Sequence, residues 1–334
     1  MSNPKWVLSP FIDLIRRLAT RLYRTQFEWR FVGAPNGSTD VRRLLVDPRD
    51  DTLWYVSTHS HGLFVTRDGG TTWEHPLSGN VGAMALDPTN ADVVYGSSGT
   101  SVYRSTNRGE EWCQLYSLPN SESFIDSLLV ATSQTDIYLG ASNAQRNARI
   151  YRSPDGGTTW DISFDSGPRG LNIWDIAEDP INGYLYFCTE DSAFHDPSPV
   201  MRSVNRGESW DDIAPPSGPH CLNVKVDPAT HVVYLLTESR WLYESTNFGA
   251  SWSTSSQVPF GAVLLIDRNL PTRFVGGEMT AAGRAGGVYL SENAGESFRS
   301  GGLIGSYVMS LALNGTSTLL FAAAYGQGIH RRSI

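Results

Sequence analysis

The feature of this sequence that most constrains its fold is an eight-residue turn that occurs six times. Each copy reads Ser or Thr, any residue, Asp or Asn, any residue, Gly, two further residues, and then Trp or Phe. Successive copies begin about 40 to 50 residues apart, which indicates one supersecondary unit per copy. The copies are Thr66–Trp73, Ser105–Trp112, Ser153–Trp160, Ser203–Trp210, Ser245–Trp252 and Ser291–Phe298.

The residues of this turn favour a tight hairpin. The Asp or Asn side chain accepts hydrogen bonds from backbone N–H groups one or two residues on, and the Gly supplies a positive φ. The aromatic residue that ends the turn opens the next strand and buries a large apolar area between neighbouring sheets. We therefore expect all six turns to stabilise the fold rather than to take part in chemistry.

The six turns resemble the Asp-box, or BNR, repeat of sialidase-like β-propellers, and the resemblance covers residues 26–334. It implies an all-β propeller whose blades are four-stranded antiparallel sheets. It also implies that the boxes lie on the face opposite the mouth of the central channel, where ligands bind in such proteins. A partial resemblance to the photosystem II assembly factors, which have seven such blades, implies a general scaffolding role.

The two ends of the repeat predict the number of blades. After the sixth box the chain holds three further strands but no fourth, at Tyr307–Leu313, Leu319–Tyr325 and Gly328–Arg332. An alternating segment, Phe27–Val32, precedes the first complete unit and has no local partner. Pairing of this segment with the last strand would close a ring of seven blades and remove both exposed sheet edges. A ring of six blades is the alternative.

The composition indicates one large β domain. No linker interrupts the repeat, so we expect a propeller at 26–334 and a separate short segment at 1–25. Cys113, Cys188 and Cys221 fall in different units without metal-ligand spacing, which favours small buried side chains in a reducing compartment. Because we find neither a signal peptide nor a spanning segment, we expect a cytoplasmic location, with membrane association left open.

The segment at 1–25 predicts an amphipathic basic helix, with Ser9 and Pro10 as N-cap and first helical residue. Residues 1–30 hold six basic and two acidic residues, a net charge of +4, which leaves −12 on the rest of a chain whose net charge is −8. We expect the helix to attach to a surface through an apolar face and a basic face. The residues of these faces are Phe11, Leu14, Ile15, Leu18 and Leu22, and Arg17, Arg21 and Arg24.

Three attachments are compatible with such a helix. Its apolar face can pack on the propeller itself, lie in the surface of an anionic membrane, or dock into a groove on a protein partner. Nucleic acid is not expected as a partner. The rest of the chain is acidic, and the whole sequence holds only two lysines, Lys5 and Lys225.

Loops at the channel mouth hold the candidate binding residues, because loops on one face of a repeat fold usually carry its function. Aromatic and arginine side chains dominate interfaces, and aromatic faces also stack on sugar rings. No cofactor or metal is expected, since His59 and His61 have no specified third ligand. The candidates are His59, His61, Arg146, Arg149, Trp174, Glu190, His195, Arg240, Trp241, Arg284 and Tyr325.

Two classes of enzyme with similar repeats can be compared with the sequence. Sialidases carry an Arg-Ile-Pro signature before the first box, which is missing here, and hold the substrate carboxylate with three arginines. Arg42 and Arg43 are adjacent in a predicted strand, so we expect them to face opposite sides. Xyloglucan hydrolases place a catalytic Asp in the first blade, where this chain has His59. Other carboxylates remain candidates for an acid pair at the mouth: Asp126, Asp175, Glu190, Asp191, Glu238 and Glu278.

The sequence therefore predicts a non-catalytic interaction scaffold or accessory subunit. We expect it to bind a protein partner or complex and to attach to that complex, or to a membrane surface, through its N-terminal helix. No catalytic residue is assigned. The alternative is a carbohydrate-active enzyme, a glycoside hydrolase, or a lectin that binds a glycan at the channel mouth.

Overall fold

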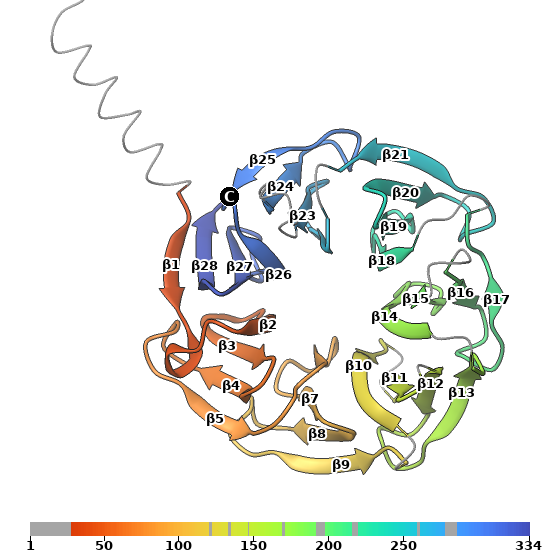
Figure 1. Cartoon of the computed structure of the whole chain (residues 1–334), viewed down its shortest axis with the longest axis horizontal. Coiled ribbons are helices and arrows are strands. Elements are labelled where there is room, and N and C mark those ends of the chain that lie inside the picture. The colour runs from red at the N-terminus through yellow and green to blue at the C-terminus, as the bar shows by residue number, and fades with distance from the viewer. Residues whose placement is uncertain are drawn as a thin grey trace, which may run out of the picture.

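The chain forms seven four-stranded antiparallel sheets arranged in a ring around a central channel (Figure 1). The predicted all-β, seven-bladed propeller is confirmed. The predicted N-terminal helix, with all of its attachment residues, lies outside the described residues, so the boundary at residue 25 stays a prediction. The computed structural model describes residues 28–119, 122–132, 135–145, 147–168, 171–191 (without the side chains of 190 and 191), 198–215, 220–258, 261–277 and 286–334.

The blades are numbered in chain order, each from its inner strand at the channel to its outer strand, and a 3-10 turn, η1 (Pro35–Gly37), precedes blade 1. Blade 1 consists of β2 (Val41–Asp47), β3 (Asp50–Thr58), β4 (Gly62–Thr66) and β5 (Glu74–Leu77), and blade 2 of β6 (Met84–Leu86), β7 (Val94–Ser98), β8 (Ser101–Ser105) and β9 (Cys113–Ser117). Blade 3 consists of β10 (Glu122–Val130), β11 (Ile137–Asn143), β12 (Ala148–Ser153) and β13 (Asp161–Asp165), and blade 4 of β14 (Leu171–Glu178), β15 (Leu185–Asp191), β16 (Val200–Ser203) and β17 (Asp211–Asp212). Blade 5 consists of β18 (Cys221–Val226), β19 (Val233–Thr237), β20 (Trp241–Ser245) and β21 (Ser253–Gln257), and blade 6 of β22 (Val263–Ile266), β23 (Arg273–Gly277), β24 (Gly287–Ser291) and β25 (Arg299–Gly302). Blade 7 consists of β26 (Tyr307–Leu313), β27 (Leu319–Tyr325), β28 (Gly328–Ser333) and β1 (Arg30–Gly33).

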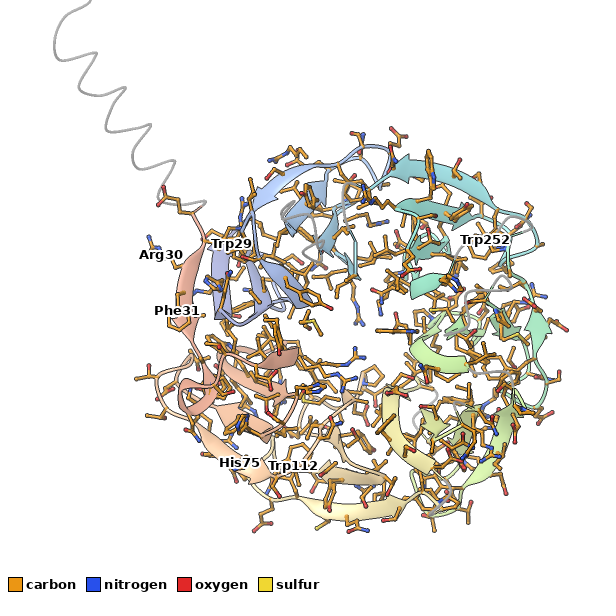
Figure 2. The ribbon with its side chains drawn as sticks, in the orientation of Figure 1. Trp29, Arg30, Phe31, His75, Trp112 and Trp252 are labelled. Carbon is orange, nitrogen blue, oxygen red and sulfur yellow. The ribbon has the colours of Figure 1, made fainter. Side chains whose placement is uncertain are left out.

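Blade 7 takes its outer strand from the other end of the chain. β1 pairs with β28 in antiparallel fashion, with Arg30 opposite Arg331. Just before β1, the indole Nε1 of Trp29 donates to the carbonyl oxygen of Gly301 in blade 6 at 2.7 Å (Figure 2). The alternating segment, for which the sequence offers no local partner strand, therefore closes the ring and covers the edge of β28.

Each repeated turn is held by hydrogen bonds of its own Ser or Thr and Asp or Asn. In the first box the Thr66 hydroxyl donates to the Asp68 carboxylate and accepts from the Gly70 N–H, both at 2.9 Å. The carboxylate also accepts from the backbone N–H groups of Thr71 and Thr72. These hydrogen bonds favour the charged form of the carboxylate and lower the pKa of Asp68 to about 2. The hydrogen bond from the Thr72 N–H contributes most to this shift.

The aromatic residue of a box packs on the blade that precedes it in the chain. Trp112 of blade 2 packs against a cluster between blades 1 and 2 to which blade 1 contributes Leu63 and Leu77. Trp252 of blade 5 donates from its indole to the carbonyl oxygen of Ile213, which follows β17, at 2.6 Å (Figure 2). A box joins the third strand of a blade to the fourth, so it lies where the inner strand ends. The inner strands begin at the opposite end of the channel, which we call the mouth.

The three cysteines do not share one environment. Cys188 and Cys221 are buried, as expected, whereas Cys113 is exposed. The expectation of a buried Cys113 is wrong because this residue begins an outer strand, β9, in which no residue is fully buried. Within the described ranges, no helix is long and apolar enough to cross a membrane.

Candidate functional site

A cavity of about 290 Å³ occupies the mouth of the central channel. Its wall is built from residues at or near the start of six of the inner strands, together with one residue that follows β3. Its volume is at the lower end of the range usual for ligand sites. The lining residues are Arg42, Arg43, His59, Phe124, Asp126, Asn172, Ile173, Trp174, Asn223, Ala262, Val263, Tyr307 and Met309.

Irregularities of strand register decide which side chains enter this cavity. β2, β10, β14, β18 and β26 each shift register near their first residues. Such a bulge inserts an extra residue and redirects the side chains beside it. In β2 the shift lies between Val41 and Arg43, and both Arg42 and Arg43 line the cavity. The expectation that these two arginines face opposite sides is therefore wrong.

Among the described residues, Asp126 contributes a carboxyl group to the wall of the cavity. Its Oδ2 accepts a hydrogen bond from the Ser142 hydroxyl at 2.9 Å. Burial raises the pKa of Asp126, and the bond from Ser142 and the charges of Arg42 and Arg43 oppose this effect without cancelling it. The group therefore keeps its proton to a higher pH than an exposed carboxyl group, which is the property required of a general acid.

Arg43 links three blades beneath the mouth. Its Nε donates to the carbonyl oxygen of Gly82 at 2.9 Å, and its Nη2 donates to the carbonyl oxygen of Asp126 at 3.1 Å. Burial lowers the pKa of Arg43, while the charges of Asp175 and Asp126 raise it. Since its donors are directed at backbone carbonyls, Arg43 holds the start of β10 in place and so positions Asp126.

A second carboxylate, Asp175, follows Trp174 in β14. Its Oδ2 lies 2.6 Å from Nζ of Lys225, an ion pair that joins blade 4 to blade 5. Asp175 is buried, with 9% of its surface exposed, and Lys225 is partly exposed. The inner wall of the propeller near the mouth thus carries two different carboxyl groups. Burial raises the pKa of Asp126, whereas Asp175 is paired with the Lys225 cation.

Aromatic rings form much of the cavity surface. Phe124 and Trp174 are 45% and 41% exposed, so part of each ring is accessible at the cavity. Tyr307 also lines the cavity, and its ring centre lies 6.0 Å from that of Tyr325, which is half-exposed. Open aromatic faces beside a few hydrogen-bonding groups are typical of sites for small organic ligands.

The structure brings three of the predicted rim residues to this cavity or next to it. His59 and Trp174 line it, and Tyr325 packs beside the lining residue Tyr307. No motif in the sequence marks Phe124 or Met309, which also line it, because their placement depends on the bulged inner strands. Arg146, His195, Arg284, Glu278 and the side chains of Glu190 and Asp191 lie outside the described residues.

The other predicted rim residues do not line the cavity. Arg149 is paired with Glu122 and Asp165 in its own blade. Arg240, Trp241 and Glu238 lie in or beside the turn between β19 and β20. His61 contacts Ser60 and His75 at the edge of blade 1. Among the described residues, no group of three or more His, Cys, Asp or Glu side chains is placed to hold a metal ion.

These features define a seven-bladed β-propeller with an aromatic cavity that holds a carboxyl group at one end of its channel. No protein-family model matches the chain. It is similar to the xyloglucanase Xgh74A of Acetivibrio thermocellus, with 24% identity over 273 residues, or 64% of this chain and 32% of that protein. A xyloglucanase of a Paenibacillus species is 25% identical over 265 residues, or 70% of this chain and 23% of that protein. The chain thus spans a third or less of the length of these curated relatives.

Two solved structures have the same fold. The GH74 xyloglucanase of Xanthomonas campestris superposes with a TM-score of 0.69 at 18% identity, covering 92% of this chain and 53% of that one. YCF48, in a structure with a bound D1 peptide, superposes with a TM-score of 0.66 at 14% identity, covering 92% and 96%. The two sequence relatives are named as glycan-degrading enzymes, which overturns the non-catalytic scaffold as the main interpretation and favours its carbohydrate-active alternative.

Proposed function

We propose that the chain is an Asp-box propeller that binds a glycan such as xyloglucan at the channel mouth and hydrolyses its glycosidic bonds. The observation that carries this proposal is the Asp126 carboxyl group, whose pKa is raised by burial, in one cavity with the exposed rings of Phe124 and Trp174. The sequence similarity to two xyloglucanases supports the same chemistry. The proposed partner is therefore a glycan.

Hydrolysis of a glycosidic bond requires a proton donor and a second carboxylate. In the proposed reaction Asp126 donates its proton to the oxygen of the leaving sugar as the C–O bond breaks. Asp175, paired with Lys225, does not itself line the cavity but follows the lining residue Trp174 in β14, and we assign to it the role of the second carboxylate. It takes a proton from the water that attacks the anomeric carbon, so one water molecule is consumed for each bond cleaved. Arg43, which bonds to the backbone carbonyl of Asp126, is a positioning residue.

The rest of the cavity suits a sugar chain. The faces of Phe124 and Trp174 offer apolar surfaces on which sugar rings stack. Arg42, His59 and Asn172, at the edge of the same cavity, offer hydrogen bonds to hydroxyl groups. Binding by the rings and proton transfer by Asp126 are separate contributions, so they affect different kinetic constants.

The proposal is tested by the release of reducing ends from xyloglucan by the purified full-length chain. Asp126→Asn is expected to lower kcat at least about 100-fold with little change in KM, because only proton transfer is lost. Trp174→Ala is expected to raise KM about tenfold, which is about 1.4 kcal/mol of lost binding. Asp161→Asn, on an exposed outer strand, is the matched control and leaves both constants unchanged.

Two results would overturn the proposal. The first is a well-folded wild-type chain that neither hydrolyses xyloglucan nor is retarded by it in affinity electrophoresis. The second is an Asp126→Asn variant with the kcat of the wild type, since the proposed reaction then lacks its acid.

A further inference from the structure

Each box described below covers part of the preceding blade at the end of the propeller opposite the mouth. Gly109, in the second box, lies so close to blade 1 that a Cβ at this position would come within 2.8 Å of the Tyr55 ring. In the same way, a Cβ on Gly157 would overlap Leu115 of blade 2, and one on Gly249 would overlap Ile213 beyond blade 4. The boxes of blades 2 to 6 therefore act as lids on the apolar interiors of the preceding blades.

Blade 6 is the blade on which no box can lie. Its successor, blade 7, takes its outer strand β1 from the beginning of the propeller, so no turn connects β28 to β1. Trp29 replaces the aromatic residue of a box, since its indole bonds to Gly301 and the Arg332 guanidinium lies 5.9 Å from its ring centre. The sequence before Trp29 is not that of a box, because residues 22–28 lack its Ser or Thr, its Asp or Asn and its Gly at the required positions.

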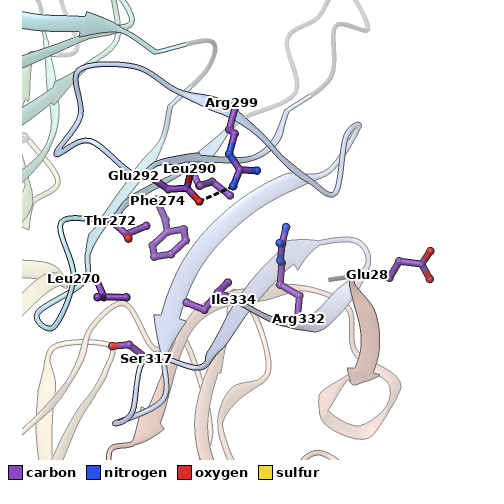
Figure 3. Close-up of a pocket in the computed structure, with 10 residues that line it drawn as sticks. All are labelled: Glu28, Leu270, Thr272, Phe274, Leu290, Glu292, Arg299, Ser317, Arg332 and Ile334. Atoms are coloured by element: carbon purple, nitrogen blue, oxygen red, sulfur yellow. Dashed lines mark hydrogen bonds and ion pairs between the residues drawn. The ribbon is translucent and has the colours of Figure 1, made fainter. Parts of the chain in front are cut away.

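A groove of about 710 Å³ lies at this junction (Figure 3). Its floor includes Phe274 and Leu290, which are 1% and 4% exposed, and Leu270 stands on its rim with 53% of its surface exposed. Ser317 and Ile334 of blade 7 line the other side (Figure 3). The groove is thus the uncovered counterpart of the surfaces that boxes cover elsewhere in the ring.

The charged groups of the groove lie around its apolar floor. Glu292 and Arg299 form an ion pair of 2.7 Å between two exposed side chains (Figure 3). Arg332 donates to the carbonyl oxygen of Gly301, and Glu28 lines the groove directly before Trp29. An occupant therefore needs apolar side chains for the floor and polar or charged groups at the edge.

We propose that residues 1–27 of this chain dock in the groove and contact its apolar floor, which no box covers. The segment joins the propeller at Glu28, which itself lines the groove. Its sequence repeats apolar residues at helical spacing, with Leu14, Leu18 and Leu22 among them, as needed to cover Leu270 and the floor. The segment thereby completes the packing of blade 6.

Physical arguments favour this occupant over a separate partner. Only a few residues separate Leu22 from Glu28, and a short tether gives an effective concentration in the millimolar range, so a small apolar contact is enough. Residues 1–27 hold five basic residues and one acidic residue, whereas the rest of the chain carries a large net negative charge. The long-range electrostatic interaction between the segment and the propeller is therefore attractive.

The test is hydrogen exchange of the full-length chain, read by mass spectrometry over residues 268–272 and 292–299, which border the groove. Leu18→Asp is expected to speed exchange there at least tenfold while exchange in blade 3 is unchanged. Thr20→Asp, which brings the same charge to the opposite side of the predicted helix, is the matched control and keeps wild-type exchange. Leu270→Arg, at an exposed position, is expected to act like Leu18→Asp and to add nothing to it in the double variant.

A second measurement does not depend on those variants. A labelled peptide of residues 1–27 is expected to bind a chain of residues 28–334, which contains all strands of the propeller, and not to bind the full-length chain. Equal exchange around the groove in the wild type, in Leu18→Asp and in the shortened chain would overturn the proposal. So would binding of the full-length chain to vesicles with anionic lipid that Leu18→Asp abolishes without any change at the groove.

Discussion

The indole Nε1 of Trp29 donates to the carbonyl oxygen of Gly301 at 2.7 Å, across the junction between blades 7 and 6. Gly302 lies so close to this indole that a Cβ there would come within 2.8 Å of it. Two box aromatics make corresponding contacts with the preceding blade: Trp252 donates to the carbonyl oxygen of Ile213, and Trp210 donates to the Ser163 hydroxyl. Trp29 therefore serves blade 7 as a box aromatic does, although it lies outside any box.

Replacement of Trp29 by Ala is expected to lower the free energy of unfolding by about 2–4 kcal/mol, because a large ring is removed from a blade junction. Trp29→Phe keeps much of the apolar contact and loses the hydrogen bond, so a loss of about 1 kcal/mol is expected. The measurement is unfolding in urea, with Trp174→Ala, an exposed ring at the mouth, as the control. Equal midpoints for Trp29→Ala and the wild type would contradict a role for Trp29 in closure.

The boxes with Asp are expected to make stability depend on acid pH. Hydrogen bonds, above all from the backbone N–H groups of Thr72 and Thr159, lower the pKa of Asp68 and of Asp155 to about 2. Their stabilising effect is complete above the unfolded-state value, about 4, and is lost as the pH falls through the folded-state value near 2. Thermal unfolding between pH 4.5 and 2 should therefore show a fall in Tm that the double variant Asp68→Asn, Asp155→Asn reduces.

The other four boxes supply the control for this experiment. They carry Asn in the same position, and Asn205 accepts from the Ser209 N–H and donates to the Ser209 hydroxyl. An amide can thus hold the turn without a charge, so the double variant should be folded at pH 7. A Tm profile of the double variant that follows that of the wild type down to pH 2 would show that these carboxylates do not set the acid sensitivity.

Two adjacent glycines of the third box are expected to differ in their tolerance of alanine. Both have positive φ, +71° at Gly156 and +98° at Gly157, so alanine is strained at either. A Cβ at Gly156 meets nothing within 4 Å, whereas one at Gly157 overlaps Leu115 of the preceding blade. We expect a loss of about 1 kcal/mol for Gly156→Ala and about 2–5 kcal/mol for Gly157→Ala, measured in urea. Similar losses for both variants would mean that the box does not press on blade 2.

The architecture could be predicted from the sequence because local turn chemistry repeats. Each box contains its own donors, acceptors and glycine, so the pattern around Asp68 already implies a hairpin and the place of the next strand. The segment before η1 has no local partner, and the last repeat unit, which ends with the strand that begins at Gly328, has only three strands of its own. Together these two observations predict the closure by β1 that the structure shows. These inferences use only local pairing and the cost of an exposed edge.

The mouth could be predicted only in part, because its side chains depend on shifts of register. A regular strand places Arg42 and Arg43 on opposite faces, and the bulge in β2 brings both to the cavity. Phe124 lies beside a similar shift in β10, and no residue type in the sequence announces it. The sequence predicts Arg149 at the rim, whereas Glu122 and Asp165 flank its guanidinium and hold it within blade 3.

Asp126 leads to a last prediction, which tests its environment without a substrate. Burial raises its pKa in the folded chain, so the folded state binds this proton more tightly than the unfolded state does. The wild type therefore loses stability from this group as the pH rises through the folded-state pKa, and it has no such loss below the unfolded-state value, about 4. Asn at this position has no proton to lose and can still accept from Ser142.

Asp126→Asn should therefore have a higher Tm than the wild type at pH 7, and the difference should vanish as the pH falls toward 4. Asp161→Asn, on the exposed strand β13, is the control and should leave the difference near zero throughout. Thermal unfolding of the three proteins at half-unit steps of pH is sufficient for the measurement. An Asp126→Asn variant that is less stable than the wild type at pH 7 would mean that the carboxylate is favoured in the folded chain, and Asp126 would then be unsuited to act as the acid of the mouth.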